Sequence, residues 1–527
     1  MRGGDQGDTV DYDAQARPRR LRRIAAGLVV GAMATALTVV AAAPASAVGS
    51  AQCAAGESQL DFVNASGIPD SDIYGTVVTS TGTVTPSGVM NASPSLALPG
   101  NFPTDPSDAS GHTYYICLQS GITSGRLWLS IGAPIVGLPG TQPTITAPYR
   151  FGYIEFSYPG QTDYSNVNDF DFPISLRTYA APGDTTPAEQ ADFSANTCQI
   201  VNAMRDAVAA VPGADWSQIL DPGTDGFLRI ISPDNDPASS TPSGWPDLTP
   251  YVMSLVGETI TVQDYYVGGG VDPGNVGWFQ YSGTFDGSGN LTLNGSLGSD
   301  SAPGAATGPN WQPAGLELAV SAADLAAGIY SQQVGGGYTI GGVTDTSNDV
   351  YARLWNDLTS AFAFGYWGSA YGTGLDTQDF FATFPTPGTT APSGGQPAFT
   401  PARTIPYPAT VPAGGISYNL YASVLSRFSP NYSFPFDENY GSGGAGTNPL
   451  LDVPTDGLIT ATLTADGWDG APGSTTCAAF SPTGGPTLPV TGPERDTGIV
   501  SMIAAALLLA GAALALFARR AVRRRQG

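Results

Sequence analysis

Lysine is absent from this chain of 527 residues, and histidine occurs only once, as His112. The missing lysine excludes Schiff-base chemistry, and a single histidine argues against a His-rich metal centre or a Ser-His-Asp triad. Charged residues are also few, at 12%. Between residues 48 and 491, 8 arginines stand against 38 acidic residues, a formal charge of −30. Such a surface repels phosphate backbones, which excludes nucleic acid as a partner.

Turn-forming residues are abundant instead. The chain contains 68 Gly and 44 Pro, with 42% hydrophobic and 10% aromatic residues. This composition favours many short strands joined by turns over a helical bundle, and the length suffices for one or two substantial cores.

The N-terminal end has the pattern of an export signal. A basic stretch at residues 17–23 precedes an apolar run at 24–43, and Ala45-Ser46-Ala47 follows. These are the n-region, the h-region and the small-residue cleavage site of a signal peptide, which we predict over residues 1–47. The alternative is a first transmembrane helix.

The C-terminal end has three parts in a fixed order. Leu488-Pro489-Val490-Thr491-Gly492 is followed by an apolar segment at 499–518 and an arginine-rich tail at 519–527. The segment is long enough to span a bilayer, and the arginines would hold its end in the cytoplasm. The order resembles the sortase cell-wall sorting signal of Gram-positive bacteria, in which a transpeptidase cleaves between Thr and Gly and joins Thr to peptidoglycan. We therefore expect a protein displayed on the cell wall, with sortase and peptidoglycan as partners.

Four cysteines remain in the exported part, and export permits disulfides. They are Cys53, Cys117, Cys198 and Cys477, for which three pairings are possible. We favour Cys53–Cys477, which would tie the ends of the body together, with Cys117–Cys198 inside it.

The body divides by composition and periodicity into a strand-rich part and a mixed part. We expect strands at residues 126–130 and 153–158, helices near residues 188–211, 322–333, 348–362 and 416–427, a hairpin over 278–295, and a closing strand at 458–464. The predicted domains are an N-terminal lead at 48–57, a β domain at 58–185 completed by strands near 430–466, a mixed α/β domain at 186–429, a wall linker at 467–487, and the sorting motif at 488–492.

A hairpin around Pro159-Gly160 contains the acidic residues of greatest interest. It would place Glu155 on one strand, with Asp163, Asp169 and Asp171 on or beyond the other. Two carboxyl groups that face one cleft are what glycosidic hydrolysis requires, since one protonates the leaving oxygen and the other activates water or attacks the sugar. The alternative is that these are solvated surface carboxylates, of which an acidic protein has many.

Segments of this region resemble a known family. Glu155-Phe156, residues 163–168 and residues 173–176 look like the core signature of the thaumatin-like fold, and are similar to glycoside hydrolase family 64, the endo-β-1,3-glucanases that release laminaripentaose. Further likenesses occur at residues 125–130, 228–233, 419–422 and 434–438. The resemblance implies a thaumatin-like β-sandwich or barrel joined to a mixed α/β part across a wide cleft, acting on β-1,3-glucan by an inverting, endo mechanism, as a monomer and without a cofactor.

The resemblance also implies roles for single residues. Glu155 occupies the place of the catalytic acid, but the second carboxylate of the family aligns to Asn168. An amide cannot accept a proton from water at neutral pH. Asp169 or Asp171 would then supply the base. An even-length turn would place Asn168 on the face of Glu155 and the three aspartates on the other, so that Asp169 could join Glu155 only through a β-bulge or the strand end.

Asp163, Asn168, Arg229 and Trp128 are candidates for substrate contacts, Arg229 through an acidic partner and Trp128 through stacking on a sugar ring. Acidic loops at 234–236 and 345–349 follow turn chemistry, so we assign no metal to them. The alternative function is a non-catalytic lectin or adhesin of the same fold, and a purely structural surface protein is a third hypothesis.

Overall fold

The structure is a computed structural model. It describes residues 51–235, 242–267, 276–296, 314–330, 416–433 and 450–478, together with a few positions between 339 and 363. The predicted signal peptide, the sorting motif, the apolar segment at 499–518 and the loop at 345–349 lie outside these residues. None of the described helices is long and apolar enough to cross a membrane.

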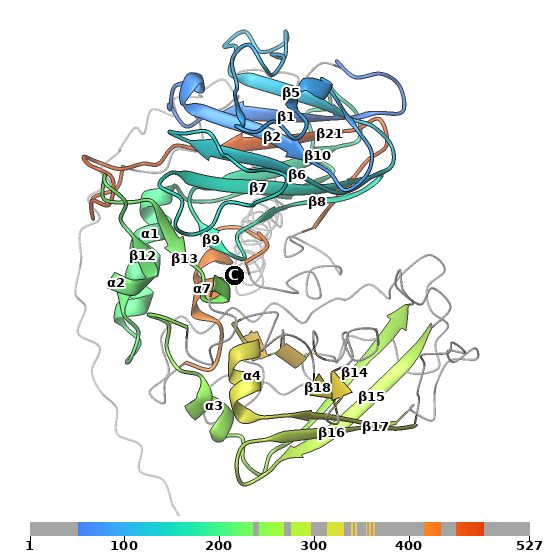
Figure 1. The fold of residues 1–527 in the computed structure, drawn as a ribbon, viewed down its shortest axis with the longest axis vertical. Coiled ribbons are helices and arrows are strands. Elements are labelled where there is room, and N and C mark those ends of the chain that lie inside the picture. The colour runs from blue at the N-terminus through green and yellow to red at the C-terminus, as the bar shows by residue number, and fades with distance from the viewer. Residues whose placement is uncertain are drawn as a thin grey trace, which may run out of the picture. The chain divides into compact units, whose positions relative to one another are not determined.

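Two six-stranded sheets form the first part of the fold (Figure 1). In order across the first sheet, the strands are β11 (Glu189–Ala191), β10 (Ile174–Tyr179), β21 (Leu458–Leu463), β1 (Ser58–Asn64), β5 (Thr113–Leu118) and β3 (Val84–Thr85). The second contains β20 (Leu451–Val453), β8 (Gly160–Ser165), β7 (Arg150–Tyr158), β6 (Ile122–Ile131), β2 (Ile73–Val78) and β4 (Leu96–Ala97).

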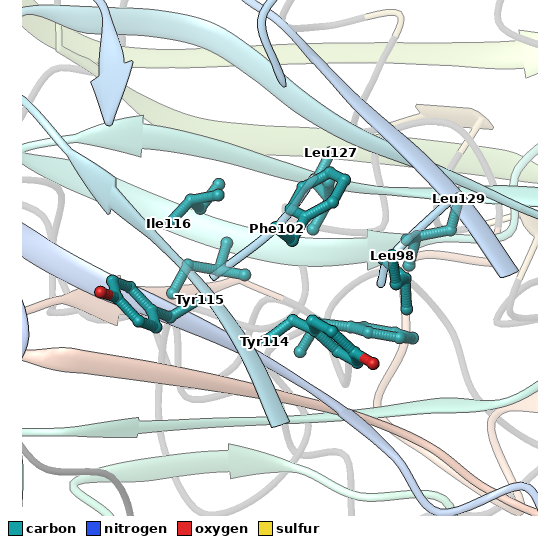
Figure 2. Close-up of a pocket in the computed structure, with 9 residues that line it drawn as sticks. Leu98, Phe102, Tyr114, Tyr115, Ile116, Leu127 and Leu129 are labelled. Carbon is teal, nitrogen blue, oxygen red and sulfur yellow. The ribbon is translucent and has the colours of Figure 1, made fainter. Parts of the chain in front are cut away.

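The two sheets share one apolar core, because alternate residues of each strand point inward. Leu60 and Phe62 of β1 are buried in the same cluster as Leu127 of β6 and Ile154 of β7. Figure 2 shows side chains from both sheets around a void of about 10 Å³, which has room for no more than about one water. This void is therefore a packing gap, too small for a sugar.

Strands from the C-terminal end complete both sheets. β21 lies between β10 and β1, parallel to β1, and β20 pairs with β8 at the edge of the second sheet. The sandwich thus depends on segments nearly 400 residues apart, a separation that Gly56 and Asp456 also bridge by a hydrogen bond.

The second part of the fold mixes strands and helices, which confirms the predicted mainly β class with a mixed α/β part. A four-stranded antiparallel sheet contains β14 (Thr259–Val267), β15 (Val276–Phe285), β16 (Leu291–Ser296) and β17 (Ala314–Val320). The helices are α1 (Thr197–Ala209), α2 (Trp216–Ile219), α3 (Thr249–Met253), α4 (Ala322–Gly328) and α7 (Leu420–Leu425). The remaining elements are β9 (Asp169–Phe170), β12 (Leu220–Asp221), β13 (Arg229–Ile231), β18 (Thr339–Ile340), β19 (Val343–Thr344) and three short 3-10 turns, η1 (Asp70–Asp72), η2 (Ser87–Val89) and η3 (Pro233–Asn235). A wide cleft between the two parts stays a prediction.

Helix α1 begins later than the periodicity predicts. Its N-cap is Asn196, whose side chain accepts from the Gln199 backbone while the Gln199 side chain accepts from the Asn196 backbone. This capping box fixes the first turn at Thr197. The residues before it, Glu189–Ala191, instead form β11 on the edge of the first sheet.

The predicted disulfide pairing is wrong. The structure joins Cys53 to Cys117 and Cys198 to Cys477. Cys117 lies on β5 opposite Gln59, close to the start of β1, whereas Cys198 lies on α1. The two central cysteines therefore belong to separate parts of the fold, and each takes a partner from the nearer terminal segment.

One buried carboxyl group makes the stability of the sandwich depend on pH. Asp61 of β1 is 1% exposed, and burial raises its pKa from 3.8 to about 8, although a hydrogen bond from Gln59 works against this. Between about pH 4 and pH 8 the folded protein holds a proton that the unfolded chain has released. The unfolding free energy should therefore fall as the pH rises through this window, by at most about 1.4 kcal/mol per pH unit from this group.

We predict that Asp61→Asn stabilises the protein at pH 8 by more than at pH 5. Urea unfolding of parent and variant at both pH values measures this difference. The exposed Asp225→Asn is the matched control and should leave the pH slope unchanged. Equal slopes for the parent and Asp61→Asn would contradict the assignment of a buried, protonated carboxyl to Asp61.

Candidate active site

A row of charged side chains crosses three neighbouring strands on the outer face of the second sheet. Arg126 of β6 pairs with Glu155 of β7, which pairs with Asp163 of β8. Residues directly opposite on antiparallel strands have Cβ atoms about 4.5–5.5 Å apart. The three side chains therefore stand side by side, and we call them the charged row.

The register of this hairpin corrects the predicted side-chain faces. Tyr158 ends β7 and Gly160 begins β8, so that Pro159 alone lies between the two strands. This odd turn pairs Glu155 directly with Asp163, whereas an even turn would have put them on opposite faces. Because the side-chain period of a strand is two, one residue in the turn decides which carboxylate faces Glu155.

Exposure differs along the charged row. The side chains of Arg126 and Glu155 are 30% and 31% exposed, whereas Asp163 is 6% exposed. The Arg126 Nε–H donates to Glu155 Oε1 over 2.7 Å. Glu155 can thus meet a ligand from solvent, with a cation on one side of it and a largely buried carboxyl group on the other.

The electrostatics of the row favour an ion pair between its first two members. Burial lowers the pKa of the Arg126 guanidinium, but the charge of Glu155, with contributions from Tyr153 and Asp163, overcomes this and raises the pKa above its usual range. The guanidinium carbon lies 4.8 Å from the centre of the Tyr153 ring, a cation–π contact that limits its movement. Arg126 therefore fixes one side of Glu155.

An aromatic cluster lies beside the charged row, on the same face of β6 and β7. Its buried members are Trp128, Ile135, Leu138, Phe151 and Tyr153. The rings of Trp128 and Tyr153 have centroids 4.5 Å apart, and Trp128 is only 2% exposed. Both faces of the Trp128 ring are thus covered by protein, so Trp128 has no face open for stacking on a sugar in this structure.

Asp169 and Asp171 occupy a different environment. Asp169 belongs to β9 and pairs with Ile231 of β13, and the Asp171 carboxylate accepts from the Phe151 backbone N–H over 2.6 Å. Phe151 is four residues along β7 from Glu155, about 13 Å at the rise of a strand. Neither aspartate stands directly opposite Glu155.

Burial dominates the protonation of these two carboxyl groups. Burial raises the pKa of Asp169 and of Asp171, the charge of Asp171 raises that of Asp169 further, and the Arg229 guanidinium works against both shifts. One oxygen of each carboxyl group has no hydrogen-bond partner among the described residues. Asp171, at 1% exposure, is out of reach of a polysaccharide in this structure. Asp169 is 8% exposed, and its place on β9 opposite Ile231 is what sets it apart from Glu155.

Arg229 is completely buried and binds protein groups. Its guanidinium donates to the backbone oxygens of Thr144, Ala147 and Tyr149 over 3.2, 2.9 and 2.5 Å, and lies 3.7 Å from Asp171. These contacts hold residues 144–149 over the aromatic cluster. We infer a structural role for Arg229 in place of the predicted substrate contact.

Asn168 is exposed at a bend between β8 and β9, outside both strands. Its backbone oxygen accepts from Ser232 and from the Asn235 side chain, so the bend is tied to the segment after β13. The amide therefore does not occupy a strand position opposite Glu155, and Asp163 holds that position.

Potential metal ligands gather at one place among the described residues, at Cys53, Glu57 and Cys117. The two cysteines form a disulfide, so they offer no thiolate. Sequence reasoning missed Arg126, which lies within a correctly predicted strand. Only the pairing of β6 with β7 reveals that it faces Glu155.

Comparison with known proteins gives a limited answer. No family model matches the chain, and no curated protein matches it. Among solved structures, a β-1,3-glucanase domain (GH64) from Clostridium beijerinckii is similar with a TM-score of 0.42 and 14% identity, over 77% of this chain and 98% of that one. The laminaripentaose-producing GH family 64 β-1,3-glucanase from Paenibacillus barengoltzii is similar with a TM-score of 0.36 and 16% identity, over 77% and 75%. Its structure with laminarihexaose has a TM-score of 0.35 and 14% identity, over the same shares. TM-scores below 0.5 are too low to assign a fold or an activity, so neither is inferred from them.

Proposed function

We propose that the protein is a glycoside hydrolase that cleaves internal bonds of β-1,3-glucan with Glu155 and Asp163 as its carboxyl pair. The observation that carries the proposal is the direct cross-strand pairing of Glu155 with Asp163 on β7 and β8, with Glu155 reaching solvent. Paired carboxyl groups on one open face are what both steps of glycosidic hydrolysis need.

Each member of the pair has a role in this mechanism. Glu155, the more exposed, acts in its protonated form and donates the proton from Oε2 to the leaving oxygen while Oε1 accepts from Arg126, and Asp163 accepts a proton from the attacking water. Arg126 and Asp163 lie on opposite sides of Glu155, so the ion pair draws the Glu155 carboxyl toward β6 and away from β8. An inverting enzyme needs a gap of about 6.5–9.5 Å between its two carboxyl groups to admit water, so the mechanism requires that Glu155 be held toward β6 in this way.

The choice of β-1,3-glucan as substrate rests on the resemblance of residues 155–176 and the flanking segments to glycoside hydrolase family 64. The charge and the exposure of the row do not distinguish one glucan from another.

Two observations favour a second function, a glucan-binding lectin or adhesin. The Glu155 carboxylate is already engaged by Arg126, and Asn168 carries an amide where the resembling family has its second acid. A charged row of this kind can hydrogen-bond sugar hydroxyls without cleaving the polymer.

Incubation of the purified protein with laminarin tests the choice between these functions. Hydrolysis should release short oligosaccharides, and proton NMR of the fresh reducing ends should show inversion at the anomeric carbon. Retention would contradict the inverting mechanism. Binding to insoluble glucan without product would favour the lectin. If the protein neither binds glucan nor releases product, both proposals are wrong.

We also propose that the protein is exported and joined to the cell wall through Thr491. The order of LPVTG motif, apolar segment and basic tail supports this. Mass spectrometry of a peptidoglycan digest should find a peptide that ends at Thr491 linked to wall fragments. A chain that keeps residues 492–527 in mature cells would contradict the attachment.

A further inference from the structure

The segment after β21 is bound to helix α1 at several points. We call residues 466–478 the C-terminal strap. Asp466 receives two hydrogen bonds from Arg150, of 2.6 and 2.8 Å, and one from the Thr197 hydroxyl, and its backbone oxygen accepts from Cys198. Burial alone raises the pKa of Asp466, but the charge of Arg150 overcomes this and holds the pKa below its usual range. The strap therefore begins at a partly buried ion pair.

The far end of the strap is fastened as well. The Asn202 side chain donates to the Thr475 oxygen over 3.0 Å, and the Ala478 backbone closes back on Gly467 over 2.8 Å. The ring of Trp468 packs against Phe227, with centroids 5.6 Å apart. The Cys198–Cys477 disulfide then fixes this end of the strap covalently to α1.

The position of this disulfide determines the path of any tension that enters from the C-terminus. Cys477 is the last cysteine before the sorting motif at Leu488. Tension on that side reaches Cys477 first and passes through the sulfur atoms to Cys198, because a covalent bond withstands far more force than the hydrogen bonds of the strap. The 279 residue steps between the two cysteines then lie off the covalent path.

The charged row lies on the other side of this junction. The sequence between Cys117 and Cys198 contains all three members of the row, Arg126, Glu155 and Asp163. Tension from the N-terminal side passes directly from Cys53 to Cys117 through their disulfide and bypasses the residues between them. Tension between a polymer bound at the row and the wall-linked end would thus run from β6–β8 to α1 and out through Cys477. Arg229, which holds residues 144–149, lies within residues 199–476 and therefore off the path of this tension.

We propose that the Cys198–Cys477 disulfide, held in place by the contacts of the C-terminal strap with α1, is a mechanical anchor that keeps residues 199–476 free of tension when the protein is pulled from its C-terminus. The biological role of this anchor rests on the proposed glucan binding and wall attachment. Without the disulfide, tension would break the hydrogen bonds between the strap and α1 and reach β21, which lies between β10 and β1 in the first sheet. Removing that strand would open the core that both sheets share.

Single-molecule force spectroscopy tests this proposal on the whole chain, held in detergent between handles at its two ends. Loss of the disulfide in Cys198→Ser/Cys477→Ser should add about 1,000 Å of releasable length, because each of the 279 residues contributes about 3.5 Å when extended. The first release should also occur at a lower force than in the parent. Adding dithiothreitol to the folded parent should reduce both disulfides and add about 1,200 Å of releasable length in all, so the test does not depend on folding of the variant.

The matched control is Cys53→Ser/Cys117→Ser, which should add only about 220 Å for its 64 residues and leave the force of the C-terminal release unchanged. A parent that releases the longer length without reductant would overturn the proposal, as would a Cys198→Ser/Cys477→Ser variant that first yields at the parent's force. No glucan and no sortase takes part in this measurement, so failure of the proposed hydrolysis or wall attachment would be seen separately.

Discussion

Replacing Glu155 with glutamine is expected to lower the release of oligosaccharides from laminarin by about 10²–10⁴-fold while the protein stays folded. Glutamine keeps the size of the side chain and can still accept from Arg126 Nε–H, but it cannot donate a proton to a leaving oxygen. The rate should fall at every substrate concentration, so kcat changes much more than KM. Initial rates of reducing-end formation measure both constants.

Further carboxyl variants identify the partner of Glu155. Asp163→Asn should lose activity to a similar degree, because Asp163 stands directly opposite Glu155. The exposed Glu258→Gln is a matched control and should keep parental activity. If Asp163→Asn remains active while Asp169→Asn or Asp171→Asn does not, the base is one of the two buried aspartates and the proposed pair is wrong.

Replacing Arg229 with methionine is expected to destabilise the protein by about 3–5 kcal/mol. The guanidinium is completely buried, donates to three backbone oxygens of residues 144–149, and lies 3.7 Å from the Asp171 carboxyl group. Methionine fills similar space but removes the Arg229 donors from those oxygens, and it leaves only the weaker influence of the Arg150 charge on the Asp171 carboxyl group. Urea unfolding of parent and variant gives the difference.

Two other arginine variants show whether burial is the cause. Arg205 forms only a loose, partly exposed pair with Asp206 at 3.9 Å, so Arg205→Met should cost less than about 1 kcal/mol. The loss of stability in Arg229→Lys should lie between those of Arg229→Met and Arg205→Met, because an ammonium keeps the charge but cannot reproduce the planar fork of donors. An Arg229→Met protein as stable as the parent would show that the guanidinium does not hold residues 144–149.

The sequence alone predicted those features that depend on local chemistry. Alternation of apolar residues located the strands around Trp128 and Tyr153, and turn chemistry located the hairpin whose turn begins at Asp286. It also predicted that the described part would be mainly β with a few helices. Each of these features is decided by neighbours within a few residues, so a local pattern is enough.

The expected export and wall attachment come from the sequence patterns at the two ends of the chain, and the expected exclusion of nucleic acid comes from the composition. The absence of lysine and the single histidine remove whole classes of chemistry, whatever the fold. Signal peptides and sorting signals are read by other proteins as linear segments, which is why a sequence can predict them without a tertiary structure.

Only the tertiary structure decided which side chains meet. A single residue in the turn at Pro159 brings Asp163 to Glu155, strand pairing brings Arg126 to the other side, and the strap brings Cys477 to Cys198. Side chains on a strand alternate with a period of two, so an error of one residue in register reverses every face. Contacts between segments hundreds of residues apart leave no local signal, because they come from packing of the whole chain.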